Sequence, residues 1–258
     1  MTRSARPWLV WLATASLGAS LLAGSAQAQT EKQNRDQAAA VNTELALAYM
    51  RENNLTAARD KIEKALEQNS KTARTQMVAG FLYDRLGEQR KAKGHYDQAV
   101  KLAKGDPDVL NNAGAYFCRT GDYKRGEALI LQAATSALYR TPDVAYGNAG
   151  RCARGDGRPA EAEQYFRKAL SINPKQGDAL WQMAEIAQGH GNFLQARAFL
   201  ERYDAVAAST AATLWLGRSI ELGLGDKEQA ARYAQRLRNE FPTSEEAARL
   251  FEEERKQP

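Results

Sequence analysis

A single pattern of large and small residues recurs along this chain every 34 residues. The pattern has a large residue at position 4, small or apolar residues at positions 7 and 8, and an aromatic residue at position 11. It continues with alanine at positions 20 and 27 and proline at position 32, and each copy matches part of it. A repeat of this length holds two short helices but is too short to bury a core of its own, so the copies must stack on one another.

Six copies of the pattern follow one another, and two extra residues precede the fourth. In the copy that begins at Asp143, Tyr146 and Gly150 are followed by Ala162 and Phe166. The copies match the tetratricopeptide repeat, in which small residues let the two helices of a hairpin approach closely. The pattern therefore predicts an all-α fold, a right-handed superhelical solenoid of six helix pairs. The repeats are expected at residues 39–72, 73–106, 107–140, 143–176, 177–210 and 211–244.

The residues after the sixth copy predict one more helix. Ser244 is a good N-cap residue, and Glu245 and Glu246 place negative charge in the first helical turn, where the helix dipole favours it. The helix ends in the polar segment Glu252–Lys256. We therefore expect residues 245–258 to form a capping helix and tail that cover the end of the stack.

The first 28 residues are typical of a signal peptide. Arg3 and Arg6 precede an apolar stretch at 8–22 that is short for a membrane span, and a small-residue cleavage site follows at 26–28. Export with cleavage before Gln29 is therefore predicted; the alternative is an anchor that stays in the membrane. Ser25 stands where a bacterial lipobox would carry cysteine, so no lipid anchor is expected.

The charge pattern and the scarcity of chemical groups exclude several classes of function. The net charge is +5, but basic and acidic residues alternate along the chain, which argues against a nucleic-acid partner. The two histidines, His95 and His190, lie in different repeats, and no nucleophile motif, phosphate loop or metal-ligand spacing is present. The sequence therefore predicts a binding protein rather than an enzyme, with no metal and no cofactor.

Cys118 and Cys152 lie on the first helices of the third and fourth repeats. First helices of successive repeats pack side by side, so the two thiols can approach each other. In an oxidising compartment they would form a disulfide that stabilises the chain by about 3–4 kcal/mol. The alternative is a pair of buried free thiols.

The tetratricopeptide resemblance implies that positions 2, 5, 9, 12 and 13 of the first helices face a concave groove. Exposed aromatic and arginine side chains on such a surface are typical anchors for a peptide or a helix. The alternative is that the tryptophans pack between repeats and that the arginines only solvate the surface. The candidate groove residues are Met77, Phe81, Trp181, Trp215, Leu222, Arg85, Arg119 and Arg151.

Four segments resemble a particular family of repeat proteins. The first three are Asn111–Cys118, with its paired asparagines and its cysteine; Leu138–Pro142, which reads Leu-Tyr-Arg-Thr-Pro; and Asn148–Cys152. The fourth is the C-terminal run Leu237–Ala247. Together they resemble the type IV pilus biogenesis proteins of the PilF/PilW family, and the resemblance extends over about residues 39–250.

The family resemblance implies a periplasmic protein at the outer membrane that helps the secretin pore of the type IV pilus to assemble, or stabilises the pilus fibre. It also implies that Cys118 and Cys152 are joined in a disulfide. Ser25 departs from the many family members that are lipoproteins, so association with the outer membrane is expected to depend on a partner. Two alternatives are an adaptor of another envelope machine, such as cell-wall or polysaccharide export, and an enzyme or an enzyme-bound regulatory subunit.

Overall fold

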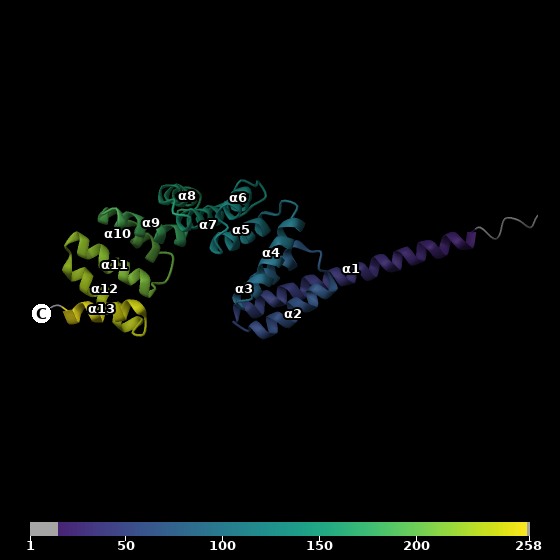
Figure 1. Cartoon of the computed structure of the whole chain (residues 1–258), viewed down its shortest axis with the longest axis horizontal. Helices are drawn as coiled ribbons and strands as arrows, with labels where there is room; N and C mark the ends of the chain where they lie inside the picture. Colours follow the sequence, from purple (N-terminus) through teal and green to yellow (C-terminus); the bar gives the residue numbers. More distant parts are fainter. Residues whose placement is uncertain (1–14, 257–258) are drawn as a thin grey trace, which may run out of the picture. The chain divides into compact units, whose positions relative to one another are not determined.

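A computed structural model describes residues 15–256, and of residues 15–28 and Lys256 it describes only the backbone (Figure 1). Within the described residues, all regular secondary structure is helical. The all-α class is therefore confirmed. The helices are α1 (Ala15–Arg51), α2 (Leu55–Gln68), α3 (Ala73–Arg85), α4 (Gln89–Leu102), α5 (Pro107–Arg119), α6 (Tyr123–Ala134), α7 (Pro142–Gly155), α8 (Pro159–Ile172), α9 (Gly177–Gly189), α10 (Phe193–Asp204), α11 (Ala211–Leu224), α12 (Lys227–Glu240) and α13 (Glu245–Lys256).

The helices form two compact units, one made of α1 to α4 and the other of α5 to α13. In both units each odd-numbered helix packs against the helix that follows it, which gives the helix pairs of a tetratricopeptide solenoid. We call the odd-numbered member of each pair the first helix and the even-numbered member the second helix. In the second unit, each first helix from α7 onward also contacts the second helix of the preceding pair.

After each first helix, one residue with a positive backbone φ, in the left-handed region, lets the chain turn sharply into the second helix. Glycine occupies this place in five pairs, because a backbone φ near +75° or more disfavours any residue with a Cβ atom. Asn53, with a φ of 58°, takes the same place after α1. The recurrence of glycine at these turns therefore has a direct backbone cause. The glycines are Gly87, Gly121, Gly157, Gly191 and Gly225.

Close packing of aromatic rings on glycine joins the two helices of a pair. Phe166 on α8 is fully buried, and a Cβ atom at Gly150 on α7 would lie 2.5 Å from its ring. Gly217 on α11 faces Tyr233 on α12 at the same calculated distance of 2.5 Å. The small residue at each of these two places is thus required by the ring that packs over it.

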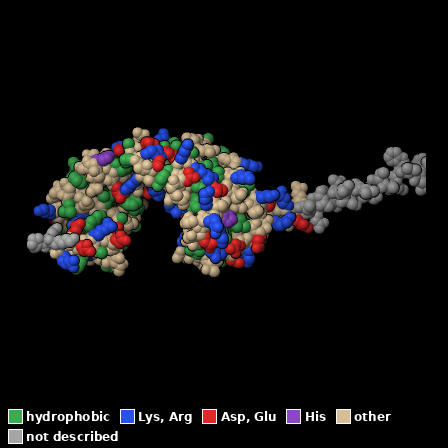
Figure 2. Space-filling model, in the orientation of Figure 1, with side chains coloured by type: hydrophobic (Ala, Val, Ile, Leu, Met, Phe, Trp, Pro, Cys, Tyr) green, Lys and Arg blue, Asp and Glu red, His purple; other side chains and the backbone are tan. Residues whose placement is uncertain are grey.

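Basic and acidic side chains are mixed over the face of the molecule seen in Figure 2. Many of them form exposed ion pairs, such as Arg167 with Glu163 (2.6 Å) and Arg236 with Glu240 (2.7 Å). Such pairs each add little to stability, because solvent screens them. They keep the surface polar without concentrating charge of one sign.

The predicted signal peptide falls largely on residues that the structure does not describe. Residues 1–14 lie outside the described part, and the side chains of residues 15–28, including Ser25, are not described either. The backbone of α1 runs through the expected cleavage site before Gln29. In the described part of the chain, no helix is both long enough and apolar enough to cross a membrane.

Candidate functional site

A cleft of about 360 Å³ lies along the first helices of the second unit. Successive first helices lie side by side there, so residues from four helices reach one surface. Its lining is mixed in character, with one large aromatic side chain among charged and amide groups. The lining residues are Arg154 from α7, Glu185 and Gln188 from α9, Ala212, Trp215, Leu216 and Ser219 from α11, and Glu246 and Arg249 from α13.

Hydrogen bonds between neighbouring first helices hold the polar side chains of the cleft in place. The Arg154 guanidinium donates to the carboxylate of Glu185 at 2.6 Å. One pair further along, the amide of Gln188 donates to the Ser219 hydroxyl at 3.1 Å. These side chains are therefore oriented before any ligand arrives, which lowers the entropy cost of binding.

Trp215 supplies the apolar part of the cleft. Its ring lies 5.3 Å from the Arg218 guanidinium, and it also packs against the buried cluster of Leu214, Leu237 and Leu250. One side of the ring thus contributes to the core while another part lines the cleft. A half-buried tryptophan flanked by arginine is a common kind of anchor in protein interfaces.

Trp181, in contrast, lies mainly between helices. It packs against the cluster that contains Leu200, Leu216 and Ile220, and its indole Nε1 is buried without a hydrogen-bond partner. Of the two interpretations that the sequence left open for this residue, the contacts match packing between repeats.

The other predicted residues of the second unit lie outside the cleft lining. Leu222, near the end of α11, is 46% exposed. Arg151 on α7 pairs with Asp178 on α9 at 3.4 Å. Arg119 on α5 lies over the ring of Tyr116 at 5.6 Å. Each of these arginines therefore has an interaction within the protein.

Three predicted residues, all on α3, belong to the first unit. Met77 is buried, whereas Phe81 is 42% exposed. Arg85 donates to the backbone oxygen of Met50 at 2.7 Å and to the Asn53 side chain at 2.8 Å. Arg85 thus ties the end of α3 to the end of α1, and Phe81 is the member of this group that presents an apolar surface.

Sequence reasoning missed several residues that line the cleft. Glu185 and Ser219 occupy position 9 of their repeats, Gln188 occupies position 12, and Arg249 follows in the helix after the sixth repeat. The tetratricopeptide resemblance places positions 9 and 12 on the groove, but the candidate groove residues include only apolar and cationic side chains. Acidic and amide residues at those positions were the available indication.

Cys118 and Cys152 are bonded in the structure and join α5 to α7. Their Cα atoms are 5.1 Å apart, within the range that a disulfide spans without backbone movement. Gly126 on α6 leaves room for the bond, because a Cβ atom there would lie 2.4 Å from the Cys118 Sγ atom. The disulfide therefore links two successive first helices.

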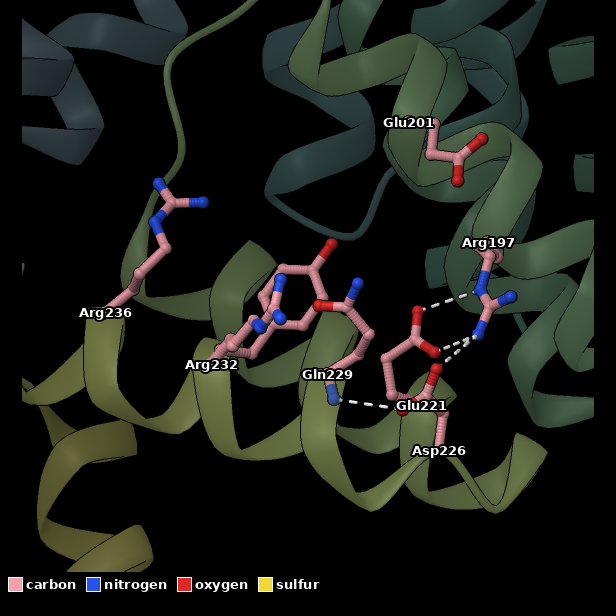
Figure 3. Close-up of a pocket in the computed structure, with 8 residues that line it drawn as sticks. Arg197, Glu201, Glu221, Asp226, Gln229, Arg232 and Arg236 are labelled. Carbon is pink, nitrogen blue, oxygen red and sulfur yellow. Dashed lines mark hydrogen bonds and ion pairs between the residues drawn. The ribbon is translucent and has the colours of Figure 1, made fainter.

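A second hollow, of about 350 Å³, lies beside α10 and α12 (Figure 3). Arg197 on α10 donates to both carboxylate oxygens of the buried Glu221. At the start of α12, Asp226 accepts a hydrogen bond from the backbone of Gln229 at 3.0 Å. Arg236 pairs with Glu240. These groups satisfy one another, and the hollow is explained by its role in joining α10, α11 and α12.

His95 on α4 is half-buried and has structural partners. Its Nδ1 atom lies 2.7 Å from the side-chain oxygen of Gln76, and its ring stacks on Tyr83 with centroids 5.2 Å apart. Burial, and then the charge of Lys91, holds the pKa of His95 below its ordinary value. His190, in contrast, is exposed at the end of α9.

The depressed pKa of His95 predicts a loss of stability in mild acid. Above the ordinary pKa of 6.5 the imidazole is neutral in both states, whereas below it the unfolded chain binds a proton more readily than the folded chain. His95→Gln should therefore reduce the fall in stability between about pH 7.5 and about pH 5.5 by up to about 1.4 kcal/mol. Urea unfolding at both pH values measures this. His190→Gln is the matched control, and an equal effect from it would contradict the prediction.

Comparisons with known proteins agree with the helix-pair architecture. Two family models described as tetratricopeptide repeat match residues 153–215 and 211–244. Neither description is that of an enzyme family. Among the described residues, no group of three or more His, Cys, Asp or Glu side chains is placed to hold a metal ion.

The relatives support the resemblance that the sequence motifs indicated. The type IV pilus assembly protein PilF of Pseudomonas aeruginosa is 25% identical over 93% of this chain and 95% of its own length. A solved structure of P. aeruginosa PilF covers 85% of this chain and 99% of its own, with a TM-score of 0.75 and 25% identity. PilW, described as a widely conserved type IV pilus biogenesis factor, has the same TM-score at 28% identity and covers 83% of this chain and 99% of its own. The chain is thus a tetratricopeptide-repeat protein similar to the type IV pilus proteins PilF and PilW.

Proposed function

We propose that this protein is a periplasmic adaptor of type IV pilus biogenesis that binds the outer-membrane secretin and helps it to assemble or to remain stable. The main support for this proposal is the cleft along the first helices of the second unit. The chain is also similar to PilF over nearly its whole length. The proposed activity is binding, because the cleft presents a tryptophan, arginines and carboxylates but no arrangement for catalysis.

The cleft suits an extended or helical segment of a partner. Trp215 offers an apolar surface on α11, and the Arg154–Glu185 ion pair offers a donor on α7 and an acceptor on α9. A segment with an apolar side chain and flanking polar groups would satisfy both. Holding such a segment keeps an unassembled secretin subunit in place until its ring closes.

The proposed location rests on the predicted signal peptide and on the cysteine pair. A disulfide persists in the periplasm, whereas reducing compartments break it. Since Ser25 replaces the lipobox cysteine, attachment to the outer membrane is proposed to occur through the secretin itself and without a lipid anchor.

A gene deletion tests the proposed function. Envelope fractions of the deletion strain should lack the heat-resistant secretin multimer but still contain the monomer, because assembly and not synthesis depends on the adaptor. The wild-type gene should restore the multimer. A copy with Arg154→Ala and Trp215→Ala should restore it less, because both side chains line the cleft.

Leu194→Ala is the matched control, since Leu194 is 71% exposed on α10 and does not line the cleft. Circular dichroism and equal protein levels verify that all variants fold. An intact multimer with few or fragile pili would move the role to the pilus fibre. Normal secretin and normal pili would refute the proposal and favour an adaptor of another envelope complex.

A further inference from the structure

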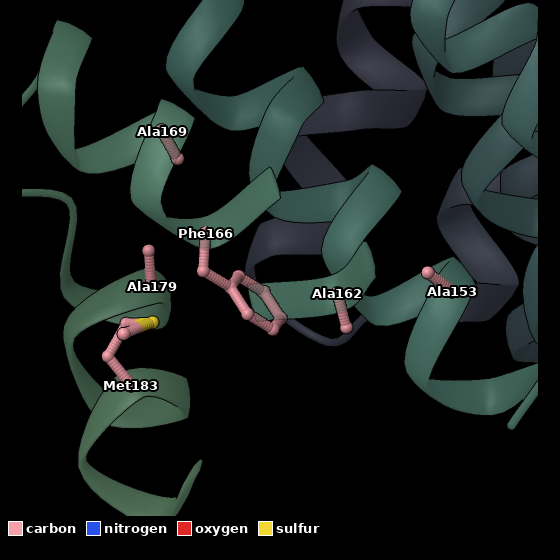
Figure 4. Packing of buried hydrophobic residues seen from close by; sticks show 6 residues of the cluster. All are labelled: Ala153, Ala162, Phe166, Ala169, Ala179 and Met183. Atoms are coloured by element: carbon pink, nitrogen blue, oxygen red, sulfur yellow. The ribbon is translucent and has the colours of Figure 1, made fainter. Parts of the chain in front are cut away.

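One face of α3, α7, α9 and α11 stacks on the preceding pair. In α9 this face holds Ala179 and Met183, at positions 3 and 7 of the repeat, with Ile186 at position 10. The two buried side chains point toward Phe166 and Ala169 of α8 (Figure 4). The same positions of α3, α7 and α11 are also buried. They are Thr75, Ala79 and Leu82, then Ala145, Ala149 and Cys152, and then Thr213, Gly217 and Ile220.

In α1, two of the corresponding positions carry large apolar residues that are exposed. Val41 at position 3 is 59% exposed and Leu45 at position 7 is 40% exposed. Ala48 at position 10 is half-buried. The residues that face α2 and α3 lie on the opposite side of the helix. We call Val41, Leu45 and Ala48 the open face of α1.

The other end of the chain is built differently. The buried side of α13, with Ala247 and Leu250, packs on α11 and α12. Ion pairs hold it there, from Arg218 to Glu253 at 2.9 Å and from Arg238 to Glu254 at 2.6 Å. The side of α13 opposite this contact carries the exposed charged residues Glu245, Arg249 and Glu252, and Phe251 is also exposed.

The two ends therefore differ in chemistry. A terminal repeat that faces water needs a polar outer surface, and α13 largely has one. The open face of α1 instead repeats the residue types that form the stacking interface in the interior of the solenoid. The occupant that matches this interface is a helix, because the second helix of the preceding pair contacts each of α3, α7, α9 and α11.

We infer that the open face of α1 binds an amphipathic α-helix of a partner protein, seated where the second helix of a preceding repeat would lie. The contact of α8 with α9 defines the chemistry of this helix. It presents an aromatic or large aliphatic residue, then alanine three positions later and an aliphatic residue four positions later, as Phe166, Ala169 and Leu170 do. The site is separate from the cleft, and it stands whether or not the secretin is the ligand of the cleft.

A peptide copied from the chain itself tests the inference. The peptide comprises residues 159–172, which form α8. In the folded protein α8 packs on the positions of α9 that are equivalent to the open face of α1. A short helix is marginal in water, so the free peptide needs a lactam bridge to hold it helical. The bridge joins Lys168 to the glutamate introduced by Gln164→Glu, and both positions are on the exposed side of α8. Fluorescence anisotropy should show saturable binding of this labelled peptide to the full chain.

Val41→Glu with Leu45→Glu should weaken peptide binding by at least about tenfold, a change of about 1.4 kcal/mol, because it places charge in an apolar contact. Both side chains are exposed and glutamate is a good helix former, so the variant should fold, which circular dichroism verifies. Leu194→Glu is the matched control, and a peptide with Phe166→Ser should bind weakly.

Two results would overturn the inference. One is failure of the helical peptide to bind, or binding that the open-face substitutions leave unchanged. The other is a dimer of the protein alone, seen by sedimentation and lost in the Val41→Glu, Leu45→Glu variant. That dimer would assign the open face to a second copy of this chain instead of a partner.

Discussion

Replacing Phe166 with alanine is expected to lower the free energy of unfolding by about 3–5 kcal/mol. Phe166 is fully buried, and its ring fills the space between Gly150 on α7 and Met183 on α9. Since glycine leaves no side chain that can move into the gap, the cavity would stay largely open. The change removes contacts both within the fourth pair and with the fifth.

Urea unfolding followed by circular dichroism measures this loss. Phe251→Ala is the matched control, because Phe251 is 66% exposed on α13 and the same atoms are removed. The control should change the free energy of unfolding by less than about 0.5 kcal/mol. Equal effects of the two substitutions would contradict the packing described for α7, α8 and α9.

Loss of the Cys118–Cys152 disulfide is expected to lower the free energy of unfolding by about 3–4 kcal/mol. The bond closes a loop across a sequence separation of 34 residues, which restricts the unfolded chain. It joins α5 directly to α7, so the third and fourth pairs should lose the most stability. Thermal unfolding with and without a reductant, and of the Cys118→Ser, Cys152→Ser variant, measures the effect.

The double cysteine variant serves as its own control for the reductant. Its melting temperature should not respond to reductant, whereas that of the wild type should fall to nearly the same value. Thiol titration verifies that the reductant has broken the bond. If the melting temperature of the reduced wild type is then unchanged, the expected stabilisation is contradicted.

The repeat architecture was predictable because it depends on local rules. Glycine at the turns follows from the left-handed backbone that ends each first helix, and small residues such as Gly150 follow from the ring that packs on them. Both rules act within one repeat, so they recur in the sequence at the repeat period. The cysteine pair was predictable for a different reason: the two residues lie on neighbouring first helices, which pack side by side.

The candidate site was less predictable. Repeat position identifies which side of a helix a residue occupies, but not how far a long side chain reaches. Trp181 and Trp215 both occupy position 5, yet Trp181 packs between helices and Trp215 lines the cleft. Arg85 was expected in a groove and instead binds the backbone at the end of α1.

Local backbone geometry and close packing act over a few residues, so the helix pairs, their turns and the spacing of the stacking residues could be predicted from the sequence. Which side chains can meet a partner depends on burial, and burial depends on neighbours that are distant in sequence. Met183 and Leu45 share one repeat position, but Met183 is fully buried against α8, whereas Leu45 is 40% exposed.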